Sequence, residues 1–583
     1  MGSRLQFDTV GRSGRLNVAV VGHPCLLASL LSTGGNARNF NRVTSVVTVN
    51  RNQCEGTSMN STCFRLLNLT AVLLAVNSLI LPATLCAGDE NDFYRLVDVS
   101  VKQARTDSRA AKWKPAPDDV VLEISGMAFM DEDRLAVCTR KGEIWILTGV
   151  LTAPEKPLQY HRFATSLHEP LGLLYDDGDF ITTQRSEVTR VKDTNGDGHA
   201  DEFQTVSKGW GVSGHYHEFV FGPEKDAHGD LWITLNIATN VKGQEQINRS
   251  LYEPTLQVRQ AKWRGWGLRI SKDGKLHPVC GGMRSPSGIG SNLNGDMFYS
   301  DQQGHWVSAG SLHHMREGVF FHHPESLASM NQPESTIKGV RRIPNGVPFP
   351  LAVAQFPQLK PPAVWFPYKK MGQSATDIIV DDSEGKFGPF HGQLFVGEFT
   401  QASVNRVFLE KVGGEYQGAC FPFRRGFASA VLRLCQASDG SMMSGLTNRG
   451  WSSLGSASYG LQRLVWTGET PFEIQEMRAT PTGFDLQFTK AVDPNSATNV
   501  ASYLMDSYTY LYHNDYGSDE IQKQRLVIRK SELLQDGKTV RLTVNGLRRM
   551  FVHELLAGGI RSTDGEPLLH TQAFYTLNRI PRR

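Results

Sequence analysis

An oxygen-rich loop at residues 193–201 is the first stretch whose residue types and spacing could do chemistry. Side-chain oxygens stand at its first, third, fifth and ninth positions and a glycine at its sixth: Asp193, Asn195, Asp197, Asp201 and Gly198. Calcium takes roughly six to eight oxygen ligands, and the glycine lets the carbonyl of His199 turn inward. Without a cation the clustered carboxylates would repel one another. The loop therefore predicts a calcium site that includes His199.

The sequence around this loop differs from the helix-loop-helix calcium hand. Gln204 stands at the twelfth position, where that hand needs a bidentate glutamate. The flanking segments Glu187–Val191 and Glu202–Val206 have the pattern of strands. We therefore expect the loop on a β-hairpin, and the alternative is a polar Asx/Gly turn that binds nothing.

Two histidines, His215 and His217, follow shortly after the loop. On a strand they would point to the same face, an arrangement that suits a metal or a proton relay. The alternative is a buried, hydrogen-bonded pair without chemistry. A second histidine group occupies residues 305–323, and its irregular spacing favours an exposed insertion loop over a transition-metal patch.

The composition favours an all-β protein and gives no sign of nucleic-acid binding. The 583 residues include 56 glycines, and aromatic residues make up 9%, as expected for a chain of many short strands and turns. The formal net charge is +3 with mixed signs, so no basic patch or acidic tail stands out.

The eight cysteines do not form a metal or haem motif. Four of them lie in the first 87 residues, and the chain contains no C-x-x-C or C-x-x-C-H sequence. This excludes a cysteine-framed zinc site and a c-type haem attachment sequence. Of the three full pairings open to the remaining four cysteines, we favour one that joins Cys420 to Cys435.

The N-terminal region has the pattern of a processed leader. Residues 1–58 show no sustained period and are expected to be a non-native or disordered extension. Residues 59–87 have a short charged start, an apolar stretch and a small-residue exit, which predicts a signal peptide and a secreted or periplasmic protein. The apolar stretch is too short and interrupted for a membrane span, so none is expected after its removal. Residues 88–119 are expected to be a linker or entry segment.

A unit of apolar run, Asp/Gly turn and second apolar run recurs along residues 120–468. Its six copies begin at Gly126, Gly172, His217, Gly288, Asp377 and Ala430. The shorter spacings match one four-stranded blade of ~40–50 residues, so we expect a six-bladed β-propeller; a solenoid or two stacked sandwiches is the alternative. In a propeller the start of each copy faces the tunnel mouth, which would make His215, His217, Arg284 and Asp377 neighbours.

Residues 469–583 have the pattern of a second all-β domain. Apolar residues alternate in GFDLQF and KTVRLTVNGL, the period-two pattern of half-buried strands. We expect a small immunoglobulin-like β-sandwich. Its tyrosine-rich insert, SYTYLYHNDYGSDE, is either a recognition surface or a packed strip.

The segments GHYHEFVFGPEKDAHGDLWITLN and GGMRSPSGIGSNLNGDMFYSDQQG resemble the glucose/sorbosone dehydrogenase family of soluble quinoproteins, built on six-bladed propellers. The chain looks most like the large secreted members found in planctomycete-type bacteria. The resemblance implies pyrroloquinoline quinone (PQQ) as cofactor and a sugar hydroxyl as the reacting group. It places His217, or else His215, as the base that takes the hydroxyl proton, and Arg284 beside the quinone carbonyl.

The resemblance also implies cationic groups against the carboxylates of the cofactor. Lys369, Lys370 and Arg406 are the candidates, and Ser285 stands where the family usually carries an asparagine after the arginine. A serine offers one hydroxyl in place of an amide, so a quinone contact is in doubt. The Asp193 loop is expected to be structural, because the family holds its cofactor-bound calcium differently.

Three functions remain open from the sequence. The first is a PQQ-dependent sugar or alditol dehydrogenase, which would need a separate electron carrier because the chain has no haem motif. The second is a non-catalytic propeller that binds a carbohydrate, glycan or protein. The third is a calcium-dependent lactonase-type hydrolase, supported by analogy of fold alone.

Overall fold

The computed structural model describes residues 88–102, 120–213, 215–238, 261–340 and 342–582. The predicted extension (1–58) and signal peptide (59–87) lie outside the described residues. Within the described ranges, no helix has the length and apolar character needed to cross a membrane.

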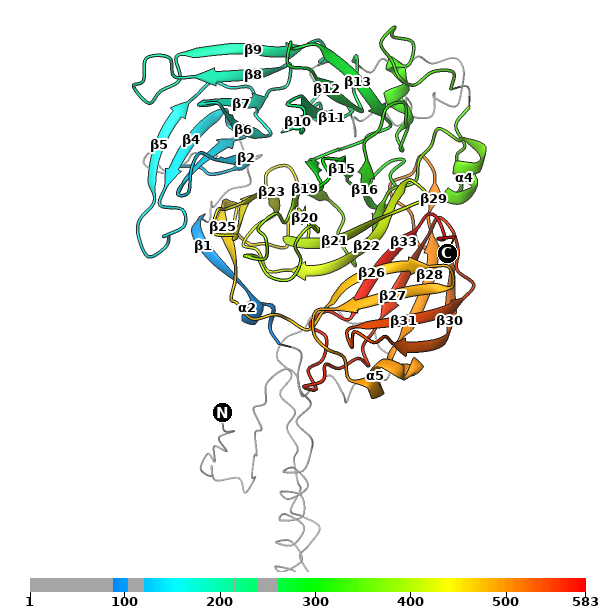
Figure 1. Ribbon diagram of the computed structural model, residues 1–583. Coiled ribbons are helices and arrows are strands. Elements are labelled where there is room, and N and C mark those ends of the chain that lie inside the picture. The colour runs from blue at the N-terminus through cyan, green and yellow to red at the C-terminus, as the bar shows by residue number, and fades with distance from the viewer. Residues whose placement is uncertain (1–87, 103–119, 214, 239–260, 341, 583) are drawn as a thin grey trace, which may run out of the picture. The chain divides into compact units, whose positions relative to one another are not determined.

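The described chain is an all-β propeller with little helix (Figure 1). Five separate four-stranded antiparallel sheets act as blades. The first contains β2 (Ile124–Phe129), β3 (Arg134–Thr139), β4 (Glu143–Thr148) and β5 (Gln159–Ala164). The second contains β6 (Leu173–Asp176), β7 (Asp179–Thr183), β8 (Glu187–Lys192) and β9 (Glu202–Lys208). The third contains β10 (Val220–Lys225), β11 (Leu231–Leu235), β12 (Trp266–Ile270) and β13 (Leu276–Gly281).

The remaining two separate sheets complete this set. One contains β14 (Gly288–Ser291), β15 (Met297–Asp301), β16 (Gly310–His314) and β18 (Val364–Phe366). The other contains β23 (Val431–Gln436), β24 (Met442–Thr447), β25 (Tyr459–Trp466) and β1 (Tyr94–Lys102). Because β1 is the outer strand of this last sheet, the N-terminal end of the described chain closes the propeller, where we had expected a linker.

The fifth predicted repeat unit, which begins at Asp377, is part of a larger sheet. An eleven-stranded sheet begins with β19 (Ala375–Val380), β20 (Leu394–Glu398), β21 (Ser403–Val412) and β22 (Glu415–Arg424). It continues with β33 (Gln572–Leu577), β32 (Phe551–Leu556), β28 (Leu504–Thr509), β30 (Ile521–Leu533), β31 (Thr539–Asn545), β27 (Gly483–Phe488) and β26 (Ile474–Thr480). The predicted separate immunoglobulin-like sandwich is not confirmed, because these C-terminal strands extend the sheet of β19–β22.

Short elements complete the structure. A two-stranded sheet pairs β17 (Val347–Pro348) with β29 (Leu511–Tyr512). The helical elements are α2 (Glu90–Phe93), α4 (Phe349–Gln355), α5 (Pro494–Thr498) and the 3-10 turns η3 (Pro324–Ser329) and η4 (Val500–Ser502).

The predicted repeats coincide with the innermost strands of the propeller. The copies begin at or within a few residues of β2, β6, β10, β14, β19 and β23, and these six strands contact one another in turn around a closed ring. The turn chemistry explains the hairpins: Asp177 and Gly178, with φ of 54° and 89°, join β6 to β7. Two positive φ values are the signature of the tight turn that matches strand twist.

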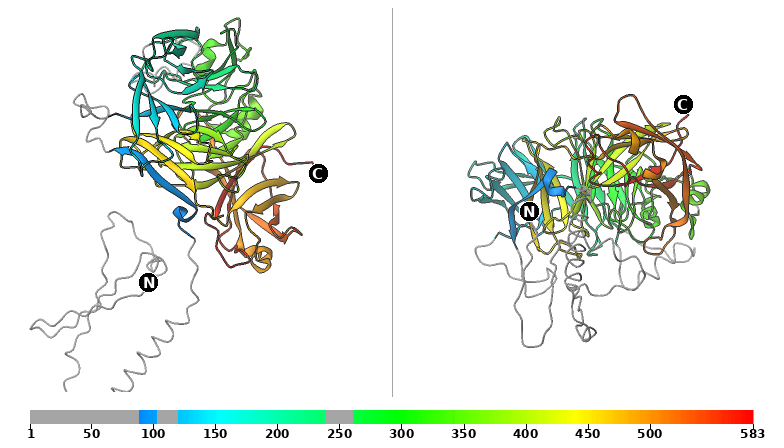
Figure 2. Two further views of the ribbon diagram at one scale, coloured as in Figure 1. Left: turned by 60° about the vertical axis from the view of Figure 1, so that its left-hand side comes forward. Right: turned by 90° about the horizontal axis from the view of Figure 1, so that it is seen from below.

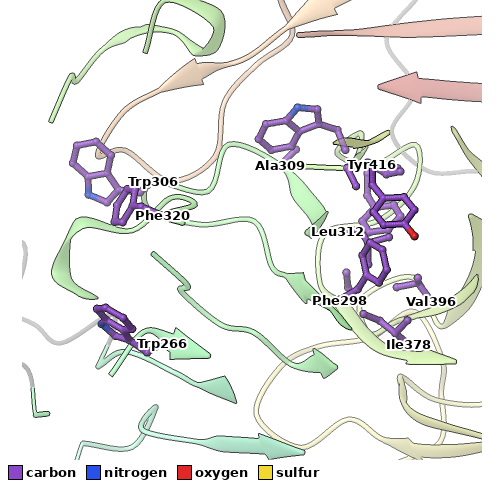
Figure 3. Packing of buried hydrophobic residues seen from close by; sticks show 14 of the residues in the cluster. Trp266, Phe298, Trp306, Ala309, Leu312, Phe320, Ile378, Val396 and Tyr416 are labelled. Atoms are coloured by element: carbon purple, nitrogen blue, oxygen red, sulfur yellow. The ribbon is translucent and has the colours of Figure 1, made fainter. Parts of the chain in front are cut away.

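A large apolar cluster links the blades to the C-terminal strands (Figure 3). The ring of Phe298 on β15 meets the ring of Tyr416 on β22 edge-on at 5.2 Å. Trp263 and Trp266 are buried and pack edge to face at 5.1 Å, as expected for blade packing. The same cluster includes Phe574 from β33, so propeller and C-terminal strands share one core.

The described cysteines are free, so the predicted Cys420–Cys435 disulfide is wrong. Cys420 on β22 is buried, and its thiol donates to the carbonyl of Trp365 at 3.4 Å. Cys435 lies on β23, in a different sheet. The two cysteines are near in sequence, but they lie on strands of two different sheets.

The guanidinium of Arg433 lies at the centre of the strand ring. It donates to the carbonyls of Ser125 at 2.9 Å, Leu171 at 2.9 Å and Ser287 at 3.0 Å, which precede or flank strands of three other blades. Its charge faces Asp377 on β19 at 3.6 Å, and its Cζ lies 5.7 Å from the ring of Phe221 on β10. The side chain of Arg433 on β23 therefore makes a contact at each of the five other innermost strands or at the residues just before them.

We expect Arg433→Met to lower the free energy of unfolding by about 3–5 kcal/mol, because it leaves buried carbonyls and Asp377 without their partner. Thermal unfolding followed by circular dichroism at pH 7 measures the change. Arg95→Met is the matched control, since Arg95 is an exposed arginine on β1 of the same sheet, and it should change stability by less than about 0.5 kcal/mol. Equal effects of the two substitutions would contradict the central role of Arg433.

His570 ties the N-terminal helix to the C-terminal strands. One ring nitrogen lies 2.5 Å from a carboxylate oxygen of Glu473, and the other lies 3.1 Å from a carboxylate oxygen of Glu90 on α2. Burial alone would lower the pKa of His570, but the two carboxylates outweigh it and raise the pKa to about 9. The folded protein therefore holds a proton here that the unfolded chain releases near pH 6.5.

The stabilisation from His570 is complete below about pH 6.5 and is lost as the pH rises through about 9. We expect the melting temperature of the wild type to fall across this interval and that of His570→Gln to be lower but flatter. At pH 6 the free energy of unfolding of His570→Gln should be lower than that of the wild type by about 3 kcal/mol. His228→Gln, at an exposed histidine, is the control and should keep the wild-type slope. A parallel slope in His570→Gln would disprove the linkage.

Candidate functional site

A cavity of about 140 Å³ lies at one mouth of the tunnel. It is formed by segments that enter the innermost strands and by segments that follow the second strand of several blades, and Tyr516 adds a wall from the C-terminal region. The lining residues are Arg140, Leu171, Tyr216, His217, Phe219, Phe221, Asn236, Arg284, Ser285, Ser287, Gln302, Ser374, Phe399, Leu432, Arg449, Gly450, Trp451 and Tyr516. Three predicted site residues, His217, Arg284 and Ser285, therefore meet in one place.

His217 reaches the cavity from the turn that precedes β10. Its backbone N–H donates to Nδ1 of His215 at 3.2 Å, and its carbonyl accepts from the N–H of Phe219 at 2.8 Å. Arg185 donates to the carbonyls of His215 and Tyr216 at 3.1 and 2.7 Å. These bonds fix the turn and aim His217 inward.

The structure corrects the prediction that both histidines share one face of a strand. His215 and His217 lie in a turn outside β10, so the strand alternation does not apply. Of the two, only His217 lines the cavity. Burial and the charge of Arg185 lower the pKa of His215, against the opposing effect of Glu218.

Arg284 enters the cavity from the segment between β13 and β14. Its side chain is 4% exposed, and Nη1 makes only two long contacts, to Ser285 Oγ at 3.3 Å and to the Gln303 carbonyl at 3.5 Å. Its Nε is buried and has no hydrogen-bond partner among the described residues. A Cβ at Gly304 would overlap the Arg284 side chain, so the glycine keeps the space that the arginine occupies. Burial lowers the pKa of Arg284, but a guanidinium stays charged at any ordinary pH.

Asn236, at the end of β11, joins the two predicted residues. Its Nδ2 donates to the carbonyls of His217 and Ile237, the second at 3.1 Å. The N–H of Ile237 donates to the carbonyl of Arg284 at 3.2 Å. The Oδ1 of Asn236 is buried and has no hydrogen-bond partner in the described structure. A ligand donor would satisfy this oxygen.

Buried carboxylates hold the segments around the cavity through their backbone. Asp301 accepts from the N–H groups of Arg284 and Ser285, both at 2.8 Å. Glu398 accepts from the N–H groups of Gln373 and Ser374 at 2.7 and 2.6 Å. Burial raises the pKa of Asp301 to about 6, although these N–H groups oppose the shift. The carboxylates of Asp301 and Glu398 thus accept hydrogen bonds from the backbone, and no carboxylate is among the lining residues.

The other cations of the cavity are neutralised. Arg140 pairs with Glu169, which also accepts from Arg185 at 2.5 Å, and Arg449 pairs with Glu123. Burial opposes ionisation of Glu169, but the neighbouring guanidinium charges outweigh it and lower its pKa. Among the described residues, no carboxylate lies within ion-pair distance of the Arg284 guanidinium. Arg284 is therefore the cation best placed to meet negative charge on a ligand.

The predicted cationic partners of the cofactor are not in this cavity. Lys370 pairs with Glu520 and Glu554 at 2.5 and 2.6 Å. Lys369 does not line the cavity, and its Nζ lies 5.3 Å from the ring of Tyr368.

Arg406 is fully buried in the packing of β21 against β26. Its Cζ lies 4.0 and 4.2 Å from the rings of Phe390 and Phe421, and it donates to the carbonyls of Ile474 and Gln475 at 2.6 and 2.8 Å. Burial lowers its pKa to about 10. Its Nη1 and Nη2 groups donate to protein, and the side chain does not line the cavity, so its position serves the fold.

Asp377 lies away from His217, against our expectation. It lines a second cavity of about 350 Å³ that also includes Glu224 and Arg433. Ser374, at the entry to β19, lines the first cavity. A strand advances about 3.3 Å per residue, so three residues carry Asp377 roughly 10 Å along the tunnel.

The Asp193 loop lies on the hairpin between β8 and β9, as predicted. Its side chains accept N–H groups of the loop itself: Asp193 from Gly196 and Gly198 at 2.7 and 2.8 Å, and Asp201 from Thr194 at 2.9 Å. In the described part of the chain, no group of three or more His, Cys, Asp or Glu side chains is placed to hold a metal. Calcium at Asp193, Asn195, Asp197, His199 and Asp201 stays a prediction.

The histidines after residue 305 are not an exposed loop. His313, His322 and His323 are buried, and the Nε2 atoms of His313 and His322 lie 3.0 Å apart. Burial lowers the pKa of His322 to about 3, so the pair is neutral and one ring donates to the other. These histidines lie where the propeller packs against the C-terminal region, and the hydroxyl of Tyr512 donates to the carbonyl of His322.

Several lining residues escaped the sequence analysis. Asn236 could have been found, because it directly follows the apolar strand LWITL. Arg140, Trp451 and Tyr516 come from other blades or from the C-terminal region, and no local pattern marks them.

Comparisons with known proteins give one family model and several solved structures of low identity. A domain of unknown function, DUF7133, matches residues 159–422. No curated protein matches the sequence. Similar solved structures include a PQQ-bound aldose sugar dehydrogenase from Streptomyces coelicolor, with 13% identity, 64% of this chain and 98% of that chain covered and a TM-score of 0.39. The soluble aldose sugar dehydrogenase of Escherichia coli shows 12% identity, 64% and 99% coverage and a TM-score of 0.39.

The PQQ domain of a pyranose dehydrogenase from Coprinopsis cinerea is also similar, with 11% identity, 64% and 95% coverage and a TM-score of 0.36. At these identities the likeness concerns the fold and assigns no role to any residue of this chain.

Proposed function

We propose that the cavity of His217 and Arg284 is the active site of a quinone-dependent dehydrogenase that oxidises a sugar hydroxyl. The observation that supports it is the meeting, in one cavity without carboxylates, of an imidazole and a guanidinium that has no ion-pair partner among the described residues. Asn236 connects the backbones that carry both side chains.

The donor set suits the quinone edge of PQQ, a flat aromatic tricarboxylate, whereas Lys369, Lys370 and Arg406 lie outside the cavity and would not meet its carboxylates. The cavity offers Arg284 as an unneutralised cation, Ser285 and Gln302 as polar groups, and the exposed rings of Tyr216 and Trp451. When bound, the quinone supplies the hydride acceptor. Arg284 and Ser285 are the residues that would hold its carbonyl side, and the serine contributes one hydroxyl.

The residues of the chain account for the remaining chemistry. His217 takes the proton of the substrate hydroxyl, because a neutral imidazole is a competent base near neutral pH. Arg284 stabilises negative charge that develops on an oxygen in the cavity, and burial strengthens this effect. Apolar walls from Phe219, Phe221 and Leu432 limit water around the reacting groups.

The proposal includes the finer features of the sequence analysis. Strands β19–β22 act as a sixth blade, since β19 occupies its place in the ring of innermost strands. The substrate is a small carbohydrate or glycan, and electrons leave to a separate carrier. Secretion to the periplasm or medium accords with the predicted signal peptide.

We expect the purified chain to show a change in quinone absorbance on titration with PQQ, and to reduce a dye when a monosaccharide is added. His217→Gln should lower kcat by about 10²–10⁴ because it removes the base, and Arg284→Gln by about 10² or more because it removes the charge. His391→Gln, at an exposed histidine, is the control and should retain activity.

Two outcomes would refute the dehydrogenase. One is an absence of quinone binding together with no turnover across a broad panel of sugars. The other is full activity in His217→Gln. Lactone hydrolysis that a chelator abolishes would point instead to the hydrolase alternative.

We also propose that the Asp193 loop binds calcium as a structural clasp. Calcium bound only by the folded state stabilises it, by about 2.7 kcal/mol at a hundredfold excess over Kd. A chelator should therefore lower the melting temperature of the wild type but not that of Asp193→Asn. Asp536→Asn is the control, because Asp536 caps a turn of the same kind between β30 and β31; it should keep the response. A wild-type melting temperature indifferent to chelator would exclude the site.

A further inference from the structure

The tyrosine-rich insert of the C-terminal region contains both buried and exposed tyrosines. Tyr508, Tyr510 and Tyr512 are buried at 0–1% exposure and pack in the shared core. Tyr516 is 44% exposed and lines the cavity of His217 and Arg284. The packed strip and the recognition surface are therefore neighbouring parts of one segment.

Residues 511–519, here called the C-terminal arm, are bonded to the propeller between β15 and β16. The N–H of Trp306 donates to the His513 carbonyl at 3.1 Å, and that of Gly517 to the Gly304 carbonyl at 3.1 Å. The N–H of Ser518 donates to the Ser308 carbonyl at 2.8 Å. On the other side, β29 pairs with β17. An exposed ring anchored on both sides by backbone bonds is pre-organised for contact.

The ring of Tyr516 is placed against the reactive part of the cavity. Its centroid lies 5.4 Å from Cζ of Arg284, and it meets the ring of His305 edge-on at 5.6 Å. Within the described ranges, the hydrogen bonds of the Arg284 guanidinium are long, 3.3 Å to Ser285 Oγ and 3.5 Å to the Gln303 carbonyl. Tyr516 therefore covers one face of the cation and presents its own free face to the cavity.

We propose that Tyr516 is a substrate-contacting residue that the C-terminal region lends to the propeller, and that it selects ring-form sugars. An aromatic face packs against the apolar C–H face of a pyranose, while Arg284 and Asn236 meet its oxygens. Open-chain polyols lack that flat face and bind less well. The inference rests on the proposed function, since it takes the cavity as the sugar site.

The test uses the full chain without any quinone. Saturation-transfer NMR measures binding of methyl glucoside, methyl galactoside and the open-chain polyol sorbitol. We expect the two pyranosides to bind the wild type and sorbitol to bind more weakly. Tyr516→Ala should weaken pyranoside affinity about five- to tenfold, whereas Tyr516→Phe keeps the ring and should stay within about twofold of wild type.

Two further variants separate contact from support. Gly517→Ala keeps Tyr516 but places a Cβ 2.5 Å from Gln303 Nε2 at a φ of 66°, so it should move the arm and weaken pyranoside binding as well. Tyr160→Ala removes an exposed tyrosine of β5 outside the cavity and should leave pyranoside affinity unchanged. Thermal unfolding of each variant confirms that it is folded.

Pyranoside affinity unchanged in Tyr516→Ala, or equal for pyranosides and sorbitol, would overturn the inference, as would an absence of pyranoside binding by the wild type. Because no quinone is present, failure of PQQ binding or of turnover is read separately and bears on the proposed function alone.

Discussion

The position of one guanidinium, that of Arg433, sets the arrangement of the innermost strands. A ring of strands leaves carbonyls at its centre, and each buried carbonyl needs a donor. Arg433 supplies donors to three blades and its charge to Asp377 on another. The strand ends that carry the cavity depend on this register, because a blade that rotated or slid would move Leu171 and Ser287, which line it.

A second constraint is the separation of charge around the tunnel mouth. Asp301 and Glu398 direct their oxygens to backbone N–H groups, and Glu169 pairs with two arginines. Each carboxylate thereby orders a loop, and none is among the described residues that line the cavity. Arg284 is left with weak contacts and faces the cavity. A buried cation with no ion pair among the described residues is costly, and this cost supports the proposal that Arg284 meets a ligand.

The sequence predicted those features that local patterns determine. The six repeats mark the innermost strands because each is a hairpin whose turn residues and apolar periods lie together in the chain. His217 and Arg284 were found because they stand just before such strands. The role of Arg433 could not be seen, since its partners come from other blades. The same reason explains why Lys370 and Arg406 were wrongly expected in the cavity. Their charged groups bind residues of the C-terminal region, which no local pattern places beside them. The disulfide failed because sequence proximity does not place Cys420 and Cys435 in one sheet.

The largest departure from expectation concerns the C-terminal strands, and it follows from the edge of β22. This ten-residue strand is the outermost of its four, and an uncovered edge of that length invites pairing with another chain. Here β33 covers it, with Gly418, Ala419 and Cys420 opposite Thr576, Tyr575 and Phe574. Backbone pairing and a shared core bind the C-terminal strands to the blade. The red strand β33 lies beside the yellow-green strand β22 in Figure 1, and Figure 2 gives two further views of the same strands. A module attached by a linker could not hold Tyr516 steadily beside Arg284. Continuity of the sheet allows the last hundred residues to contribute a fixed wall to a cavity made by the propeller.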